Sequence, residues 1–258
     1  ALMRALQDIA VRENDDDPQH NFFIGLAYLS GIDVEINHAR AVSLITSAAE
    51  ADLPEAMEKL ADMYYKGEGV TQNFEAHLAW RRRLTVCRER LFERSPDANT
   101  SLDYANALWR LGNALRDFGQ LEEAGIHYRA MEELISRFVT EKKFSWVERY
   151  LSICCNKLGD LAKARQDLDA AEEYYRKGLE LREKLAAQSP TPEALRDLSS
   201  SYNRLGDLAK TRQDLASAEE YYRKMLELSE KLAAQSPTPE ALRDLSVSYN
   251  NLGNLAKT

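Results

Sequence analysis

A unit of 47 residues recurs along the second half of this chain and constrains the fold more than any single motif. Residues 157–203 and residues 204–250 are identical at 40 of 47 positions. A diverged unit, residues 110–156, precedes them in the same register with 12 matches. Glycines mark this register at intervals of 47, at Gly112, Gly159, Gly206 and Gly253. A fixed period of about 20–50 residues is typical of a solenoid, in which each unit is stable only when stacked on the next.

Each unit predicts two helices. The clearest boundary lies at residues 188–192, because proline disfavours helical geometry in the residue before it. We expect Thr191 to cap a new helix with Pro192 at its first position. Apolar residues then recur at spacings of three and four as far as Ala209, followed by a second helix from about Leu215 to Ala234. Gly206 lies beside the apolar stripe, so its missing side chain is expected to let another helix approach closely.

These residues resemble the tetratricopeptide repeat, in which Leu-Gly is followed by Ala twelve residues later and by Tyr four residues beyond. The matching sets are Leu111, Gly112, Ala124, Tyr128; Leu158, Gly159, Ala171, Tyr175; and Leu205, Gly206, Ala218, Tyr222. The longer helices resemble the extended variant found in kinesin light chains. The resemblance covers residues from about 81 to 258. It implies an all-α fold, a right-handed α-solenoid of antiparallel helix pairs.

The N-terminal part repeats on a different period. Residues 28–34 resemble residues 64–70, and residues 41–44 resemble residues 77–80, in both cases 36 residues apart. This pattern resembles Sel1-like repeats, with Asp33 in place of the second glycine of the first copy. No Gly/Ser-rich spacer separates the two repeat types. We therefore expect Sel1-like repeats over 1–80, continuous with tetratricopeptide-like repeats over 81–258 in one superhelix.

Composition and motif searches exclude several function classes. A net charge of −8 argues against nucleic acid, and no apolar run is long enough for a membrane helix. The three cysteines and four histidines lack metal-ligand spacing, and no phosphate-binding loop is present. We therefore expect no enzyme activity, no catalytic residue, no metal and no cofactor. The odd cysteine count and the lack of a visible signal peptide favour the cytoplasm.

A polar stripe beside the apolar one is the candidate binding site. Its members recur every 47 residues and lie within about 60° of one another around the helix. In arrays that this chain resembles, such a face lines the concave groove, and recurrent asparagines hold an extended peptide by its backbone amides. An ordinary solvated face preserved by recent duplication is the alternative. The stripe comprises Trp109, Asn113, Arg116; Arg149, Asn156, Asp160, Lys163; Arg196, Asn203, Asp207, Lys210; and Arg243, Asn250, Asn254, Lys257.

The sequence leaves three functions open. The first is a non-enzymatic scaffold that binds a peptide or protein segment in its concave groove. The second is a regulatory arm of a larger protein whose effector domain, a caspase-like peptidase or a signalling ATPase, lies outside this chain. The third is self-association through the last helix, because the repeat is interrupted after Thr258 and Leu252 and Leu255 are expected to lack cover.

Overall fold

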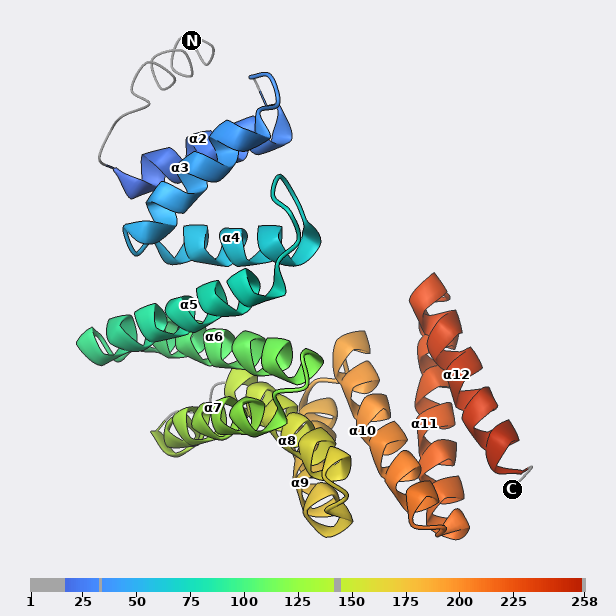
Figure 1. Cartoon of the computed structure of the whole chain (residues 1–258). Coiled ribbons are helices and arrows are strands. Elements are labelled where there is room, and N and C mark those ends of the chain that lie inside the picture. The colour runs from blue at the N-terminus through green and yellow to red at the C-terminus, as the bar shows by residue number, and fades with distance from the viewer. Residues whose placement is uncertain (1–16, 33, 142–144, 257–258) are drawn as a thin grey trace. The chain divides into compact units, whose positions relative to one another are not determined.

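The computed structural model describes residues 17–32, 34–141 and 145–256, and within these ranges the chain is helical without strands. Within these ranges eleven helices follow one another, and the two helices of each pair run antiparallel (Figure 1). The fold class predicted from the repeat is confirmed. The helices are α2 (Pro18–Ser30), α3 (His38–Glu50), α4 (Pro54–Lys66), α5 (Phe74–Arg94), α6 (Ala98–Asp117), α7 (Leu121–Glu141), α8 (Ser145–Ala164), α9 (Leu168–Gln188), α10 (Pro192–Thr211), α11 (Leu215–Gln235) and α12 (Pro239–Leu255).

The chain divides into two compact units between Ala124 and Gly125, inside α7. The expected change of repeat type at residue 80 falls within a single helix, α5. The continuity of the two parts into one superhelix remains a prediction.

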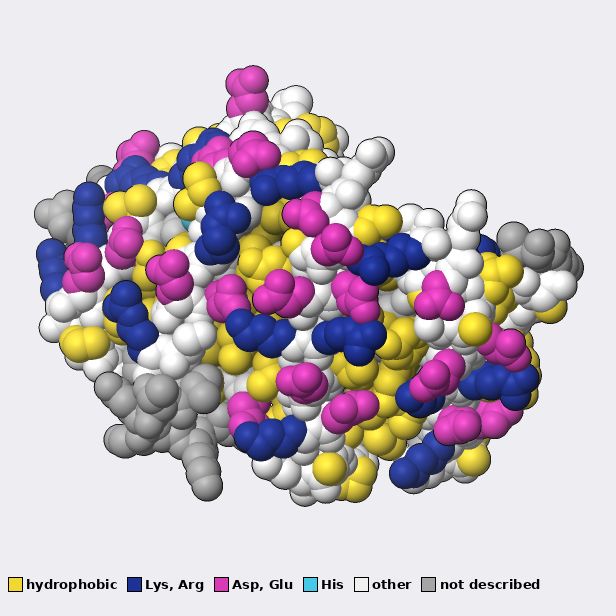
Figure 2. Space-filling model, turned by 90° about the horizontal axis from the view of Figure 1, so that it is seen from below, with side chains coloured by type: hydrophobic (Ala, Val, Ile, Leu, Met, Phe, Trp, Pro, Cys, Tyr) yellow, Lys and Arg dark blue, Asp and Glu magenta, His cyan; other side chains and the backbone are white. Residues whose placement is uncertain are grey.

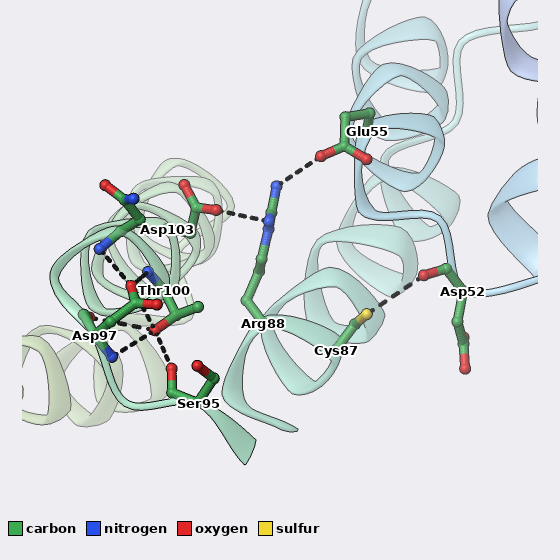
Figure 3. Close-up of polar contacts among 9 residues, drawn as sticks. Asp52, Glu55, Cys87, Arg88, Ser95, Asp97, Thr100 and Asp103 are labelled. Atoms are coloured by element: carbon green, nitrogen blue, oxygen red, sulfur yellow. Dashed lines mark hydrogen bonds and ion pairs between the residues drawn. The ribbon is translucent and has the colours of Figure 1, made fainter. Parts of the chain in front are cut away.

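In the first unit, α5 packs between α4 and α6, and one arginine ties the three helices together (Figure 3). Arg88 of α5 donates to Glu55 of α4 at 3.1 Å and to Asp103 of α6 at 2.7 Å. Asp97 starts α6 by accepting from the backbone N–H groups of Asn99 and Thr100, which otherwise lack partners in the first turn. The apolar core of this unit centres on α4, whose Met57 and Leu60 are fully buried.

The second unit shows the predicted helix pair in full. Thr191 accepts from the backbone N–H of Ala194 at 3.2 Å, and Pro192 is the first residue of α10. Gly206 of α10 faces the ring of Tyr222 of α11 so closely that a Cβ built on it would lie 2.5 Å from Cε1. Gly159 of α8 faces Tyr175 of α9 at the same 2.5 Å. The close approach predicted from the glycines is confirmed, and the group that approaches is a tyrosine ring.

In each 47-residue repeat, the turn between the two helices of a pair has one residue with left-handed backbone. Gly119, Gln166 and Gln213 recur every 47 residues and have φ of 77°, 63° and 62°. Only the first of them is a glycine, so the two glutamines adopt a conformation that costs side-chain-bearing residues about 1 kcal/mol. In the Sel1-like part Gly69 has φ 72°. Its counterpart Asp33 lies outside the described residues.

One expectation about the last helix is wrong. Leu255 is only 8 % exposed because it belongs to the core that α10 and α11 form, and Leu252 packs against the same core. The apolar residues that α12 exposes are instead Leu242, Val247 and Tyr249.

Candidate functional site

The polar stripe lies on α6, α8, α10 and α12, the first helix of each pair. In the second unit, two of its arginines form a ladder from one repeat to the next. Arg149 pairs with Asp197 at 3.1 Å, and Arg196 pairs with Asp244 at 3.0 Å, 48 residues along in each case. Both pairs are more than a quarter exposed, so each contributes only a few tenths of a kcal/mol. They join α8 to α10 and α10 to α12, the first helices of neighbouring repeats.

Asn156 of the stripe is buried, with 3 % of its surface exposed. With its amide oxygen turned toward Arg182 of α9, it accepts from both terminal nitrogens of the guanidinium at 2.9 and 3.0 Å. Arg182 itself is 6 % exposed and also donates to Ser152 Oγ, Ser201 Oγ and the Asp197 carbonyl oxygen. Burial lowers the pKa of Arg182 to about 10. Arg182 therefore joins three helices from inside, and Asn156 is one of its partners on α8.

The aspartates of the stripe bind tyrosines of the second helices. The Tyr175 hydroxyl donates to Asp160 at 2.8 Å, and the Tyr222 hydroxyl donates to Asp207 at 2.7 Å. Burial, reinforced by the neighbouring carboxylate, raises the pKa of both tyrosines far above its usual value. Arg204 of α10 adds an ion pair to Asp160 at 3.1 Å. These contacts place each tyrosine ring on its glycine.

Four residues of the stripe line one hollow of about 270 Å³ on the second unit. Asp160 and Lys163 come from α8, and Asn203 and Asp207 come from α10. Tyr175 and Arg204 complete the lining, and neither belongs to the polar stripe predicted from the sequence. Asn203 accepts from Asn251 Nδ2 at 2.7 Å, so its own amide nitrogen remains available as a donor. Lys163 is half-buried and has no ion-pair partner among the described residues.

The remaining stripe residues are not brought to this hollow. In the first unit, Trp109 is half-buried with its indole N–H buried and unpartnered among the described residues, and Arg116 pairs with its neighbour Asp117 at 2.6 Å. Asn113 is half-buried on the same helix. Lys210 is half-buried near the end of α10. Arg243, Asn250 and Asn254 are exposed on α12, and Lys257 lies outside the described residues.

The described residues offer little for chemistry. No three of their His, Cys, Asp or Glu side chains lie close enough together to hold a metal ion. Within the same ranges, no helix combines the length and the apolar character that a bilayer crossing requires. On the face shown in Figure 2, Lys and Arg side chains lie next to Asp and Glu side chains over most of the surface. Such a surface suits recognition by paired charges and hydrogen bonds rather than one strong field.

Comparison with known families identifies both repeat types. Residues 21–53 and 54–80 match the model of the Sel1 repeat. Residues 153–185 and 199–232 match that of the tetratricopeptide repeat. The chain carries Sel1 repeats followed by tetratricopeptide repeats. No curated protein sequence matches the chain.

Solved structures show the same fold at low sequence identity. BtubC (BKLC) from P. vanneervenii is 19% identical with a TM-score of 0.62, over 94% of this chain and 84% of that one. The apo form of RapI is 14% identical with a TM-score of 0.59, over 92% and 83%. Aspartyl phosphate phosphatase F from Bacillus subtilis is 15% identical with a TM-score of 0.56, over 93% and 67%. Repeats of these two types are typical of protein–protein interaction modules.

Proposed function

We propose that this chain is a non-enzymatic scaffold that binds an extended segment of a partner protein at the hollow between α8 and α10. The observation that carries the proposal is the lining of that hollow, where four residues of the recurrent stripe converge. The role of the stripe as a whole as a binding face stays a prediction. Three of its other members, Arg149, Arg196 and Asn156, support the fold through the ladder and the buried arginine described above.

The chemistry of the hollow suits a peptide main chain. Asp160 is engaged by Tyr175 and Arg204, so its charge is already compensated. Lys163 and the amide nitrogen of Asn203 are donors that match carbonyl oxygens of an extended peptide, and Lys163 also suits a carboxylate. Asp207 can accept from a backbone N–H through the oxygen that Tyr222 does not use. An extended segment that exposes main-chain groups, with an acidic side chain near Lys163, fits this pattern.

Selection of peptides from a random display library tests the proposal, with the full chain as bait. Lys163→Glu reverses the charge inside the hollow, whereas Lys231→Glu makes the same change at an exposed site of α11. We expect selected peptides to bind the wild type and Lys231→Glu equally and to lose about tenfold in affinity for Lys163→Glu. Peptides that bind all three proteins alike would show that the hollow is not the binding site.

A cytoplasmic location fits the three cysteines, which are free, and it remains part of the proposal. The regulatory arm of a larger protein, the second function expected from the sequence, stays a prediction. Self-association through α12 also stays a prediction.

A further inference from the structure

A second hollow lies on the same two helices as the proposed binding site. Its volume is about 270 Å³, equal to that of the hollow around Asp160. The second hollow lies near the beginning of α8 and α10, whereas the hollow around Asp160 lies in their C-terminal halves. Its lining includes Arg149 of α8, Leu185 of α9, and Glu193, Ala194 and Asp197 of α10.

Both hollows belong to one seam between α8 and α10. Arg149 and Asp160 are 11 residues apart on α8, and Asp197 and Arg204 are seven apart on α10. At 100° per residue, either separation leaves only about 20° around the helix, so each helix presents its two residues on one side. An ion pair crosses the seam at each hollow, from Arg149 to Asp197 at 3.1 Å and from Arg204 to Asp160 at 3.1 Å. The two hollows are therefore the two ends of a single seam.

The second hollow has an apolar lining that the next copy of the repeat covers. Leu185 and Ala194 are half-buried. Leu232, the equivalent of Leu185, is only 3 % exposed, and Ala241, the equivalent of Ala194, is 2 % exposed. The accessible pair thus lies inside the array, and the covered pair lies nearer to its last described helix. The access to Leu185 and Ala194 does not come from an end of the sequence.

The charged groups of the second hollow already have partners. Arg149 pairs with Glu193 at 2.6 Å and with Asp197 at 3.1 Å. Arg182, which also lines the hollow, is buried and donates to neutral groups of the protein. A charged side chain of a ligand would compete with these bonds, whereas an apolar one would cover the apolar lining and leave them intact. The second hollow therefore suits an apolar side chain.

The separation of the hollows sets the spacing of two anchors. Asp160 and Lys163 follow Arg149 by 11 and 14 residues on α8. At 1.5 Å per residue this is about 16–21 Å along the helix. An extended peptide advances about 3.3 Å per residue, so about five or six of its residues cover the distance.

We propose that one extended segment of a partner protein occupies both hollows, with an acidic side chain at Lys163 and an apolar side chain on Leu185 and Ala194, about five or six residues away. Lys163 has no ion-pair partner among the described residues, so an acidic anchor binds it without displacing another carboxylate. The main chain between the anchors follows the seam. The proposal rests on the proposed function and specifies which partner segment that site takes.

A display library of random peptides with one glutamate fixed at the centre tests the spacing, with the full chain as bait. We expect the selected peptides to be enriched in apolar residues about five or six positions from the glutamate. Replacing the enriched apolar residue by alanine should weaken binding to the wild type about tenfold, because it removes most of the apolar area that the second hollow covers. Fluorescence anisotropy measures these affinities.

Ala194→Gln fills the second hollow, and Ala187→Gln adds the same side chain at an exposed site of α9. Glutamine at the third position of α10 is compatible with the Thr191 cap, so circular dichroism should show unchanged helix content. We expect Ala194→Gln to weaken the selected peptides about tenfold and Ala187→Gln to leave them unchanged. Peptides that already carry alanine at the apolar anchor should lose nothing more on Ala194→Gln, since anchor and hollow act as a pair.

The outcomes separate this proposal from the proposed function. Peptides that lose affinity on Lys163→Glu, show no apolar preference at the expected spacing and bind Ala194→Gln as tightly as the wild type would overturn the second anchor and leave the proposed function standing. A library that yields no peptide sensitive to Lys163→Glu would overturn both. The enrichment and the alanine peptides need no variant of the chain, so they decide the question even where Ala194→Gln destabilises α10.

Discussion

The buried arginine of α9 offers a sharp test, because the second copy of the repeat has replaced it. Arg182 and Gly178 correspond to Ser229 and Met225, two of the seven differences between the copies. In the second copy Ser229 is fully buried and shares a hydrogen bond of 2.9 Å with Ser248, while Met225 is 6 % exposed. We predict that Arg182→Ser and Gly178→Met are each destabilising and that together they nearly cancel.

The size of each effect follows from the contacts. Arg182 donates hydrogen bonds to four neutral acceptors. A hydrogen bond from a charged donor stabilises a protein by at least about 1.5 kcal/mol, so the four acceptors together contribute about 6 kcal/mol. Burial that lowers the arginine pKa from 12.5 to about 10 opposes this by about 3 kcal/mol. Arg182→Ser should therefore cost about 3 kcal/mol of unfolding free energy.

Gly178→Met alone should also destabilise. A Cβ on Gly178 would lie 3.1 Å from the side-chain amide of Asn156 and 3.4 Å from Cys155 Cβ. Overpacking costs about 1–3 kcal/mol, and replacing a helical glycine returns up to about 1 kcal/mol. With Arg182 already shortened, the methionine fills the vacated space. The double variant should then lie within about 1 kcal/mol of the wild type, which implies a coupling energy of about 2–5 kcal/mol.

Urea unfolding, followed by far-UV circular dichroism, measures the unfolding free energy of the wild type, the two single variants and the double variant. Hydrogen exchange of the α9 amides measures the local stability around Arg182 when the array does not unfold in one step. Arg223→Ser is the control, because Arg223 is an exposed partner of Glu219 and its loss should cost under about 0.5 kcal/mol. A double variant as unstable as the sum of its single changes would refute the argument that arginine and glycine act as a pair.

Three further measurements test the turns, the glycines and a buried histidine. Gly206→Ala should lose about 1–2 kcal/mol because its Cβ meets Tyr222, whereas Gly253→Ala should lose nothing; equal effects in denaturation would contradict the tyrosine contact. Gln213→Gly should gain about 0.5–1 kcal/mol in the same assay, since its φ is 62°; a loss would contradict the strain. Burial lowers the pKa of His77 below its usual value of 6.5. The folded protein therefore binds the proton less readily than the unfolded chain does, and the unfolding free energy should fall as the pH drops below about 6.5. His77→Gln should make this fall shallower between about pH 7 and pH 5 in the same assay, and an unchanged slope would contradict the role of His77.

The parts of the fold that the sequence predicted are those set by local signals. Thr191 and Pro192 determine where α10 begins through groups within one helical turn. Gly206 predicted the close approach of another helix, because a glycine inside a helix lowers stability and is explained by the space that its missing side chain leaves. The expectation that Leu255 lacks cover is wrong because its cover comes from the preceding helices and not from what would follow it in the repeat.

The candidate site was only partly predictable, because its members are alike in sequence and different in surroundings. Asn156, Asn203 and Asn250 share one register position. The first is buried against Arg182, the second is half-buried and bonded to Asn251, and the third is exposed. Helical periodicity gives the face on which a residue lies. It does not give the partner, which comes from another helix 26 to 48 residues away.

The differences between the two close copies therefore carry more site information than their identities. Identity at 40 of 47 positions follows from duplication alone, whatever the residue does. Two of the seven differences replace the buried pair Gly178 and Arg182 by the buried pair Met225 and Ser229. A third replaces Lys157 by Arg204, which lines the hollow and pairs with Asp160. The residues of each copy must pack and bond with the helices next to that copy. A substitution in an otherwise constant repeat therefore marks a place where the neighbouring residues changed. A comparison of the copies could have identified Arg182 and Arg204 from the sequence.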